Sequence, residues 1–351
     1  MAKGKKDCET NQTNEPNFAS VIHVHPTNVF GGPVVDVDRM LCWGSWANMQ
    51  KIDKEWRFEL FYWDYMWGLI VCALLFGLTL GRTNPTAPES FFHNLDIASG
   101  HALIYAFIGG VIFNLGNLLL VAAISVAGMA VAFPVGVGLA LVIGAVLNYT
   151  ISPAGNPFLL FGGILLICAA IAVNAMAYQR LSKGAGASAK GIILSLLCGT
   201  VIGLFYPFVA KALIGENHLG PYTVYFVFAV GALASNFPLN YAFMRHPVSG
   251  APLAIGDYFR GHARVHLWGM LGGLIWGVGT ICNFVASYVP IVGPATSYSM
   301  GQGNAMVSAI WGIFVWKEFR GAGSTVKHLL ALMFLLFVLG LVCIALAPVI
   351  R

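Results

Sequence analysis

Between Asp96 and Arg180 the sequence contains no aspartate, glutamate, lysine or arginine. A soluble domain carries charge on about a quarter of its residues, whereas this chain of 351 residues is 58% hydrophobic and only 9% charged. A bilayer accommodates such a stretch when it folds as helices, because each helix pairs its own backbone N–H and C=O groups. The sequence therefore predicts an all-α polytopic membrane protein in contact with a lipid bilayer.

The apolar segments that are long enough to cross a bilayer number nine. They cover residues 62–81, 102–122, 126–147, 158–179, 191–213, 222–243, 267–287, 294–315 and 328–348. A shorter apolar segment, from Met40 to Met49, precedes them and would cross only half of a bilayer at about 1.5 Å per residue. About ten transmembrane helices are expected, with the first one shortened.

The residues before Met40 are a poor membrane helix, because Asp36, Asp38 and Arg39 would each cost about 2.5–3.5 kcal/mol at mid-bilayer. We therefore expect residues 1 to about 38 to lie outside the bilayer core, in a polar tail over 1–39. The first helix would be short, frayed or re-entrant. Either it is truncated here or the first 39 residues are not the natural start.

An internal repeat is suggested by matching glycines in the two halves of the chain. Gly128 is followed after eight and ten residues by Gly136 and Gly138, and Gly293 is followed at the same spacing by Gly301 and Gly303. An Asn, at 117 or 283, precedes each group. The pattern predicts two five-helix repeats, over 40–179 and 191–351, joined by a connector over 180–190. Five is an odd number, so the repeats would be inverted, as in many transporters.

The Gly-x-Gly pairs are also candidate helix breaks. Pro134, Gly136 and Gly138 would interrupt the fourth helix, and Gly301 and Gly303 would interrupt the ninth. Such breaks would free backbone carbonyls toward a solute. A simple proline kink is the alternative explanation for Pro134.

Loop charges predict the orientation. The connections after spans 1, 5, 7 and 9 hold twelve of the nineteen lysines and arginines, which places these loops in the cytoplasm and both termini outside. Four basic residues in the N-terminal tail favour the opposite orientation. The net charge of +5 forms no basic patch with interleaved aromatics, so no nucleic-acid partner is expected.

Polar side chains inside the predicted spans are mainly amides and hydroxyls. The candidate substrate-binding residues among them are Asn114, Asn117, Asn283, Tyr298, Gln302 and Asn304. Any one of them could simply bond a neighbouring helix. As a set, they favour a polar cavity for a small neutral solute that forms hydrogen bonds.

The acidic residues nearest the apolar spans on the predicted cytoplasmic side are Glu59, Asp64 and Glu318. They are candidates for coupling transport to protons or for gating, because no carboxylate lies at mid-bilayer. Anchoring at the membrane interface is the alternative.

Patterns for catalysis, metals and nucleotides are lacking in the sequence. The spans hold no HExxH-like constellation, the seven cysteines form no CxxC pair, and Lys183–Lys190 does not match a P-loop. His23 and His25 have no further metal ligands nearby in the sequence. We expect no enzyme activity, no metal and no cofactor; a transport-inactive scaffold or receptor is the alternative of another class.

Three motifs resemble one known family. Met40-Leu-Cys-Trp-Gly-Ser-Trp-Ala-Asn-Met-Gln-Lys51, then Trp56-Arg-Phe-Glu-Leu-Phe-Tyr-Trp-Asp-Tyr65, then Asn114-Leu-Gly-Asn117 are similar to the ureide permeases and to their bacterial relatives among the glucose/ribose porters. The resemblance covers roughly residues 40–348. Trp43, Trp46 and Asn48 in the first motif are further candidate substrate-binding residues.

That resemblance implies membership of the drug/metabolite transporter superfamily, with ten helices in two inverted halves. It implies uptake of a ureide or nucleobase such as allantoin or uracil, usually with protons, or else of a sugar. The plasma membrane is the expected location. The long central loop of the plant ureide permeases is reduced here to the segment from Arg180 to Lys190.

Overall fold

The computed structural model describes residues 34–350, apart from 54, 85–86, 128–131, 182–188, 249 and 290–291. Within these ranges the chain forms helices and no strands. The predicted tail up to residue 33, with His23 and His25, lies outside the described residues, as do Gly128 and most of the central connector.

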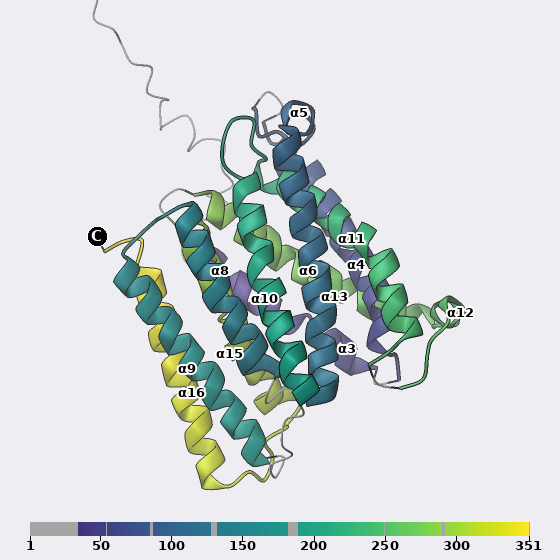
Figure 1. Ribbon diagram of the computed structural model, residues 1–351, viewed down its shortest axis with the longest axis vertical. Coiled ribbons are helices and arrows are strands. Elements are labelled where there is room, and N and C mark those ends of the chain that lie inside the picture. Colours follow the sequence, from purple (N-terminus) through teal and green to yellow (C-terminus); the bar gives the residue numbers. More distant parts are fainter. Residues whose placement is uncertain are drawn as a thin grey trace, which may run out of the picture.

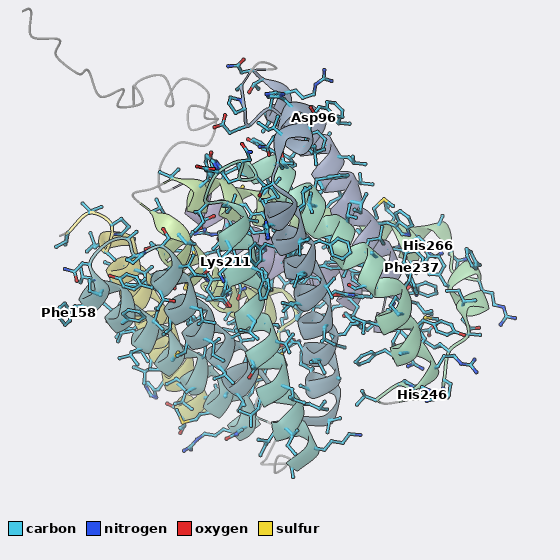
Figure 2. All side chains as sticks on the ribbon, turned by 45° about the horizontal axis from the view of Figure 1, so that its top comes forward. Asp96, Phe158, Lys211, Phe237, His246 and His266 are labelled. Carbon is cyan, nitrogen blue, oxygen red and sulfur yellow. The ribbon has the colours of Figure 1, made fainter. Side chains whose placement is uncertain are left out.

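Seven of the described helices are long and apolar enough to cross a membrane. They are α4 (Phe58–Leu78), α6 (Gly100–Ala127), α9 (Pro157–Leu181), α10 (Ala189–Ala212), α11 (Pro221–Arg245), α13 (Ala263–Tyr288) and α16 (Ser324–Leu346). Large apolar side chains such as Phe158 and Phe237 project from the outside of the bundle (Figure 2). Such a surface is suited to lipid, and the chain is an integral membrane protein.

Two of the predicted spans are not single long α-helices. The predicted span 126–147 begins too early, because α6 continues through Ala127. The helix in this region consists of a π-helical turn, η3 (Phe133–Val137), followed by α8 (Gly138–Ile151). The predicted span 294–315 is divided into α14 (Gly293–Gly301), α15 (Asn304–Ile310) and a second π-helical turn, η4 (Trp311–Val315). Gly136 lies within η3, and Gly303 lies in the turn between α14 and α15.

The first helix begins earlier than Met40. It consists of α2 (Val34–Ser45) and the short α3 (Asn48–Ile52), and α2 packs against α13 and α15. Arg39, which the sequence assigned to the polar tail, is fully buried in α2. That assignment is wrong for Arg39, because polar side chains from other helices surround its guanidinium.

The remaining described elements are short and lie between the long helices. They are η2 (Leu80–Arg82), α5 (Phe91–Ile97) and α12 (Ile255–Phe259). In Figure 1, α9 and α16 lie side by side at one edge of the bundle, and α4, α11 and α13 lie together at the other.

Glycines bring the helices of the bundle into close contact. A Cβ atom on Gly110 of α6 would overlap the carbonyl oxygen of Phe228 in α11, and one on Gly231 of α11 would overlap that of Phe107 in α6. The crossing of α4 and α13 is built in the same way, from Gly68 and Gly273. Without a side chain at these positions the two backbones approach to van der Waals distance, which is a main source of helix association in lipid.

Candidate functional site

A polar cluster forms where α2, α13, α14 and α10 meet inside the bundle. The Nη1 atom of Arg39 donates to Oδ1 of Asn283 and to Oγ of Ser297, both at 2.6 Å. The Ser297 hydroxyl lies 3.0 Å from the backbone oxygen of Asn283, to which it can donate, and Tyr206 donates to the same backbone oxygen at 3.4 Å. One cation therefore joins the first helix to two helices of the second half of the chain.

Trp43 lies one turn after Arg39, on the same face of α2. Its indole N–H donates to Oγ1 of Thr280 at 3.0 Å, and a Cβ atom on either Gly279 or Gly301 would overlap its ring. The missing side chains of these two glycines create the space for the indole. Trp43 thus sits between α13 and the end of α14.

An aromatic cluster continues from Trp43 toward the loops that carry most of the basic residues. Trp276 stacks on Trp43 with ring centroids 5.8 Å apart and contacts Phe113 at 4.3 Å. Tyr65 contacts Trp276 edge-on at 6.4 Å, and Trp46 packs on Tyr65 at 4.8 Å. Flat aromatic faces of this kind suit a planar solute, although here they are packed on one another.

A cavity of about 280 Å³ lies next to the aromatic cluster, near the start of α4. Its lining residues come from α3, from the start of α4 and the two residues before it, from α6, and from the end of α11 and the loop after it: Gln50, Trp56, Arg57, Phe58, Glu59, Leu118, Val121, Ala122, Phe243 and Val248. Phe58 packs on Tyr62 at 4.9 Å, and Asn117 donates to the Tyr62 hydroxyl at 3.1 Å. The cavity therefore ends close to a predicted site residue.

The candidate residues do not all belong to one site. Asn283 lies in the polar cluster, and Trp43, Trp46 and Asn117 in the aromatic one. Asn114 instead donates to Ser235 across α6 and α11 at 2.9 Å, and Asn48 accepts from Trp316 at 2.6 Å. Those two bonds join neighbouring helices, which is the structural role that the sequence left open for any single amide.

The other three candidates lie around the break in the ninth predicted span. The Tyr298 hydroxyl donates to the backbone oxygen of Ala140 in α8 at 3.1 Å, and its ring packs on Tyr206 at 5.1 Å. Gln302 is buried in the turn after α14, and Asn304, the first residue of α15, is half-buried.

Asp64 is the most buried of the three acidic candidates. Its carboxylate accepts from the hydroxyl of Tyr258 at 2.6 Å and contacts Nδ1 of His266 at 2.9 Å. Tyr258 comes from α12, outside the long helices, and burial followed by the bond to Asp64 raises the pKa of this phenol. The carboxylate thus connects α4 to α13 and to the loop before it.

Glu318 and Glu59 are held by cations. Lys51 lies 2.9 Å from one oxygen of Glu318, and the Tyr178 hydroxyl donates to the other at 2.7 Å. Burial raises the pKa of the Glu318 carboxyl, but the bonds from Lys51 and Tyr178 and the charge of Lys51 outweigh it, so the pKa is lowered. Glu59 pairs with Arg57 at the edge of the cavity near the start of α4.

Arg39 and His266 are functional candidates that the sequence reasoning missed. The position of Arg39, four residues before Trp43, was a usable signal, because it places both side chains on one helix face. His266 had no comparable signal, since it is 202 residues from Asp64. Among the described residues, no group of three His, Cys, Asp or Glu side chains is placed to hold a metal.

Comparison with known proteins gives one family and several relatives. The family model described as "Sugar transport protein" matches residues 40–347. Ureide permease 1 of Arabidopsis thaliana is 23% identical, over 86% of this chain and 93% of the relative. Ureide permease 2 of the same plant is 21% identical, over 85% and 92%, and the probable ureide permease A3 of Vigna unguiculata is 22% identical, over 79% and 92%.

Proposed function

Because the chain belongs to the sugar transport protein family, we propose that it is a secondary transporter of a small neutral polar solute that works by alternating access. The chain aligns with ureide permeases over nearly their whole length, so it is a transport protein and not an enzyme. Ureides or similar small solutes are the substrates that these relatives support. A ureide or a nucleobase, such as allantoin or uracil, is the substrate we favour.

The site chemistry supports a planar solute with hydrogen-bonding groups. Trp43, Trp46 and Trp276 have aromatic faces on which a heterocycle could stack once movement of the helices separates them, and Asn117 and Asn283 have amide donors and acceptors beside them. A sugar is the second candidate, because the family description names sugars and sugars also bind to aromatic faces and amides. A transport-inactive scaffold or receptor is the alternative of another class.

The pattern of helix contacts supports two inverted repeats over 40–179 and 191–351. In such a repeat α4 would correspond to α11, and α6 to α13. The α4–α13 crossing in one place would then correspond to the α11–α6 crossing in the other, and both crossings are built on paired glycines. Gly68 and Gly231 are 163 residues apart, and Gly110 and Gly273 have the same separation. Gly138 and Gly301 are also 163 residues apart. The two Gly-x-Gly pairs are 165 residues apart, so the alignment of the two halves supported by the helix contacts differs by two residues from the one that these pairs suggest.

Movement of one half against the other would open the central clusters alternately to the two sides. Breaks at Pro134, Gly136 and Gly138 and at Gly301 and Gly303 would let the fourth and ninth helices bend during that movement. We place the loops with most of the basic residues in the cytoplasm and the protein in the plasma membrane. The cavity near the start of α4 would then open toward the cytoplasm.

We assign proton coupling to Asp64. A proton carrier has to change charge near neutral pH, and Asp64 is buried with a histidine and a phenol on its oxygens. Glu318 fits this role poorly, because its lowered pKa keeps it ionised throughout the neutral range. Glu59 forms an ion pair with Arg57.

We expect Asp64→Asn to flatten the dependence of uptake on external pH, while Glu318→Gln leaves the pH profile unchanged. The stability that Glu318 gains from Lys51 is present above the ordinary pKa of glutamate and is lost only as the pH falls through its lowered pKa. Initial uptake rates between pH 5 and pH 8 measure both effects. An unaltered profile in Asp64→Asn would leave this residue with an anchoring role only.

We expect leucine at Asn117, Asn283 or Gln302 to raise the apparent substrate constant about fivefold, because one hydrogen bond contributes on the order of 1 kcal/mol. Concentration-dependent uptake into cells with matched surface expression is the measurement. Asn114→Leu is the control, since its amide bonds Ser235 between two helices. Normal constants in all three variants would remove these residues from the site.

The proposed function is tested by measuring uptake of labelled allantoin, uracil and glucose into vesicles that contain the purified protein. Saturable uptake of allantoin or uracil is expected. Saturable uptake of glucose alone would favour the sugar porter, and no uptake of any of the three would favour the scaffold.

A further inference from the structure

The connection between α11 and α13 carries the short helix α12, which in Figure 1 lies beyond the outline of the long helices, next to α11. Tyr258 of α12 donates to Asp64 at 2.6 Å, and its ring contacts that of His266 at 4.7 Å. Asp64 lies in the second turn of α4 and His266 in the first turn of α13, two helices long and apolar enough to cross a membrane. The helix α12 is therefore level with the ends of the membrane-crossing helices.

Two large apolar side chains of α12 remain exposed. Ile255 and Phe259 are four residues apart and so share one face of the helix. Phe259 is 77% exposed and Ile255 is 44% exposed. An apolar face at the level of the membrane surface is suited to the boundary between headgroups and acyl chains, where interfacial helices lie.

Exposed apolar side chains are also present on the two helices that the connection joins. Phe237 and Tyr241 lie near the end of α11, and Leu267 lies near the start of α13; each is about half exposed. These side chains face the lipid that surrounds an integral membrane protein. The apolar face of α12 is thus next in the chain to surfaces that already contact the bilayer.

Three arginines flank α12 in the chain. Arg245 ends α11, Arg260 directly follows α12, and Arg264 lies in the first turn of α13; all three are exposed. The sequence from 245 to 264 holds one carboxylate, Asp257, which contacts Arg260 at 3.2 Å. A guanidinium has five N–H donors, so this contact leaves donors for phosphate oxygens. The charge around α12 is complementary to an anionic surface.

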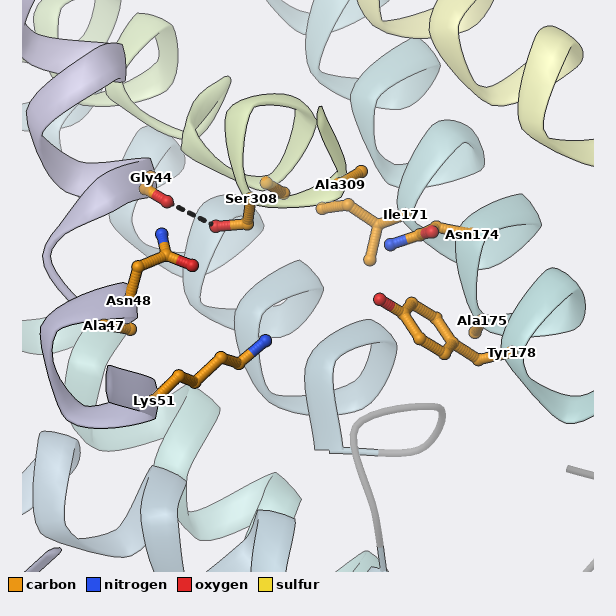
Figure 3. A pocket seen from close by; sticks show the side chains of 11 residues that line it. Gly44, Ala47, Asn48, Lys51, Ile171, Asn174, Ala175, Tyr178, Ser308 and Ala309 are labelled. Atoms are coloured by element: carbon orange, nitrogen blue, oxygen red, sulfur yellow. Dashed lines mark hydrogen bonds between the residues drawn. The ribbon is translucent and has the colours of Figure 1, made fainter. Parts of the chain in front are cut away.

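A basic residue of another connection instead serves a contact within the protein. The side chain of Lys51, in α3, points into a cavity of about 80 Å³ that α9 and α15 also line (Figure 3). Its ammonium group lies 2.9 Å from a carboxylate oxygen of Glu318, and its side chain is 39% exposed. The side chain of Arg260 is 83% exposed. Arg260 is therefore better placed than Lys51 to meet a partner outside the protein.

We propose that α12 and its flanking arginines form a membrane-surface anchor that binds anionic phospholipid headgroups. Ile255 and Phe259 enter the bilayer at the level of the upper acyl chains, and the arginines contact the phosphates. The anionic lipids of a cell membrane are concentrated in the cytoplasmic leaflet, on whose side we place this connection. Each basic residue near such a surface strengthens binding about fivefold.

The test places a nitroxide on α12 of the purified full-length protein in vesicles. Gly256→Cys carries the label, because a Cβ atom at Gly256 meets nothing within 4 Å and both apolar side chains are retained. Collisions with oxygen, which concentrates in the bilayer, and with a water-soluble nickel complex report the depth of the label, after subtraction of the signal from the native cysteines. Oxygen collisions should predominate in phosphatidylcholine vesicles that contain phosphatidylglycerol. The ratio of oxygen to nickel collisions should fall severalfold in phosphatidylcholine alone.

Variants in the labelled protein separate the apolar contribution from the charge. Phe259→Ser, and the combination of Arg260→Gln with Arg264→Gln, should each lower the ratio toward its value in phosphatidylcholine alone. Arg320→Gln is the matched control, because Arg320 is also exposed but the adjacent Phe319 is buried. Its ratio should equal that of the labelled protein without further changes. Thermal melting of each variant identifies any loss of folding.

Three results would overturn the anchor, whatever solute the protein carries. Equal ratios in the two lipid mixtures would remove the role of anionic headgroups. Nickel collisions that predominate in both mixtures would place α12 in water. A label shielded from both reagents would show that a second copy of the chain covers this face.

Discussion

Replacing Arg39 with methionine is expected to abolish solute uptake and to lower the free energy of unfolding by about 3–6 kcal/mol, since each of two charge-assisted hydrogen bonds contributes about 1.5–3 kcal/mol. Methionine retains the length of the side chain but removes the cation that bonds the buried oxygens of Asn283 and Ser297. The first helix would then lose its polar link to α13 and α14. Uptake into vesicles and thermal melting of the purified variant measure the two effects.

Two further variants test whether the effect of Arg39→Met depends on the shape of the guanidinium and on the position of the arginine. Arg39→Lys retains the charge but not the planar fork of the guanidinium, so it should recover part of the stability and little of the uptake. Arg82→Met removes an exposed arginine in η2 and should resemble the wild type. Full uptake in Arg39→Met would show that the polar cluster has no part in transport.

Alanine at Gly110 or Gly273 is expected to lower the free energy of unfolding by about 1–3 kcal/mol, which is the range for overpacking a close contact. The added Cβ atom would overlap a backbone carbonyl, that of Phe228 or that of Tyr65, and neither can move without separating two helices. The two variants should be affected alike if the crossings are equivalent. Thermal melting of the purified variants is the measurement.

Gly162→Ala is the matched control for these glycine variants. Gly162 lies within α9, and a Cβ atom there would meet nothing within 4 Å. Alanine at such a position should be neutral or stabilising by about 0.5–1 kcal/mol, because it lowers the backbone entropy of the unfolded chain. Equal melting temperatures for Gly110→Ala and Gly162→Ala would contradict the close crossing of α6 and α11.

The long helices could be predicted from the sequence because each one satisfies its backbone locally and shows a continuous apolar run. The predicted span 158–179, for example, differs by only one or two residues from α9 at each end. The span 294–315 was harder, because α14, α15 and η4 together have the length and polarity of one helix. Hydropathy measures composition and does not reveal an interruption.

The position of Arg39 inside the bundle could not be predicted from hydropathy, because a hydropathy scale assigns every arginine in a membrane helix the full free-energy cost of insertion. Its partners, Asn283 and Ser297, are 244 and 258 residues away along the chain, and the fold alone brings them to the guanidinium. The same limit explains Asn48 and Asn114. A single amide in an apolar helix gives the same sequence pattern whether it faces a cavity or bonds a neighbouring helix.

The central claim is that the protein carries its solute by alternating access, and a counterflow experiment tests that claim most directly. Vesicles containing the purified protein are loaded with unlabelled uracil or allantoin, and labelled solute is added outside at a low concentration. A carrier exchanges the internal for the external solute, so the label should accumulate transiently above its equilibrium level. Label that only approaches equilibrium, or that never enters, would contradict the account.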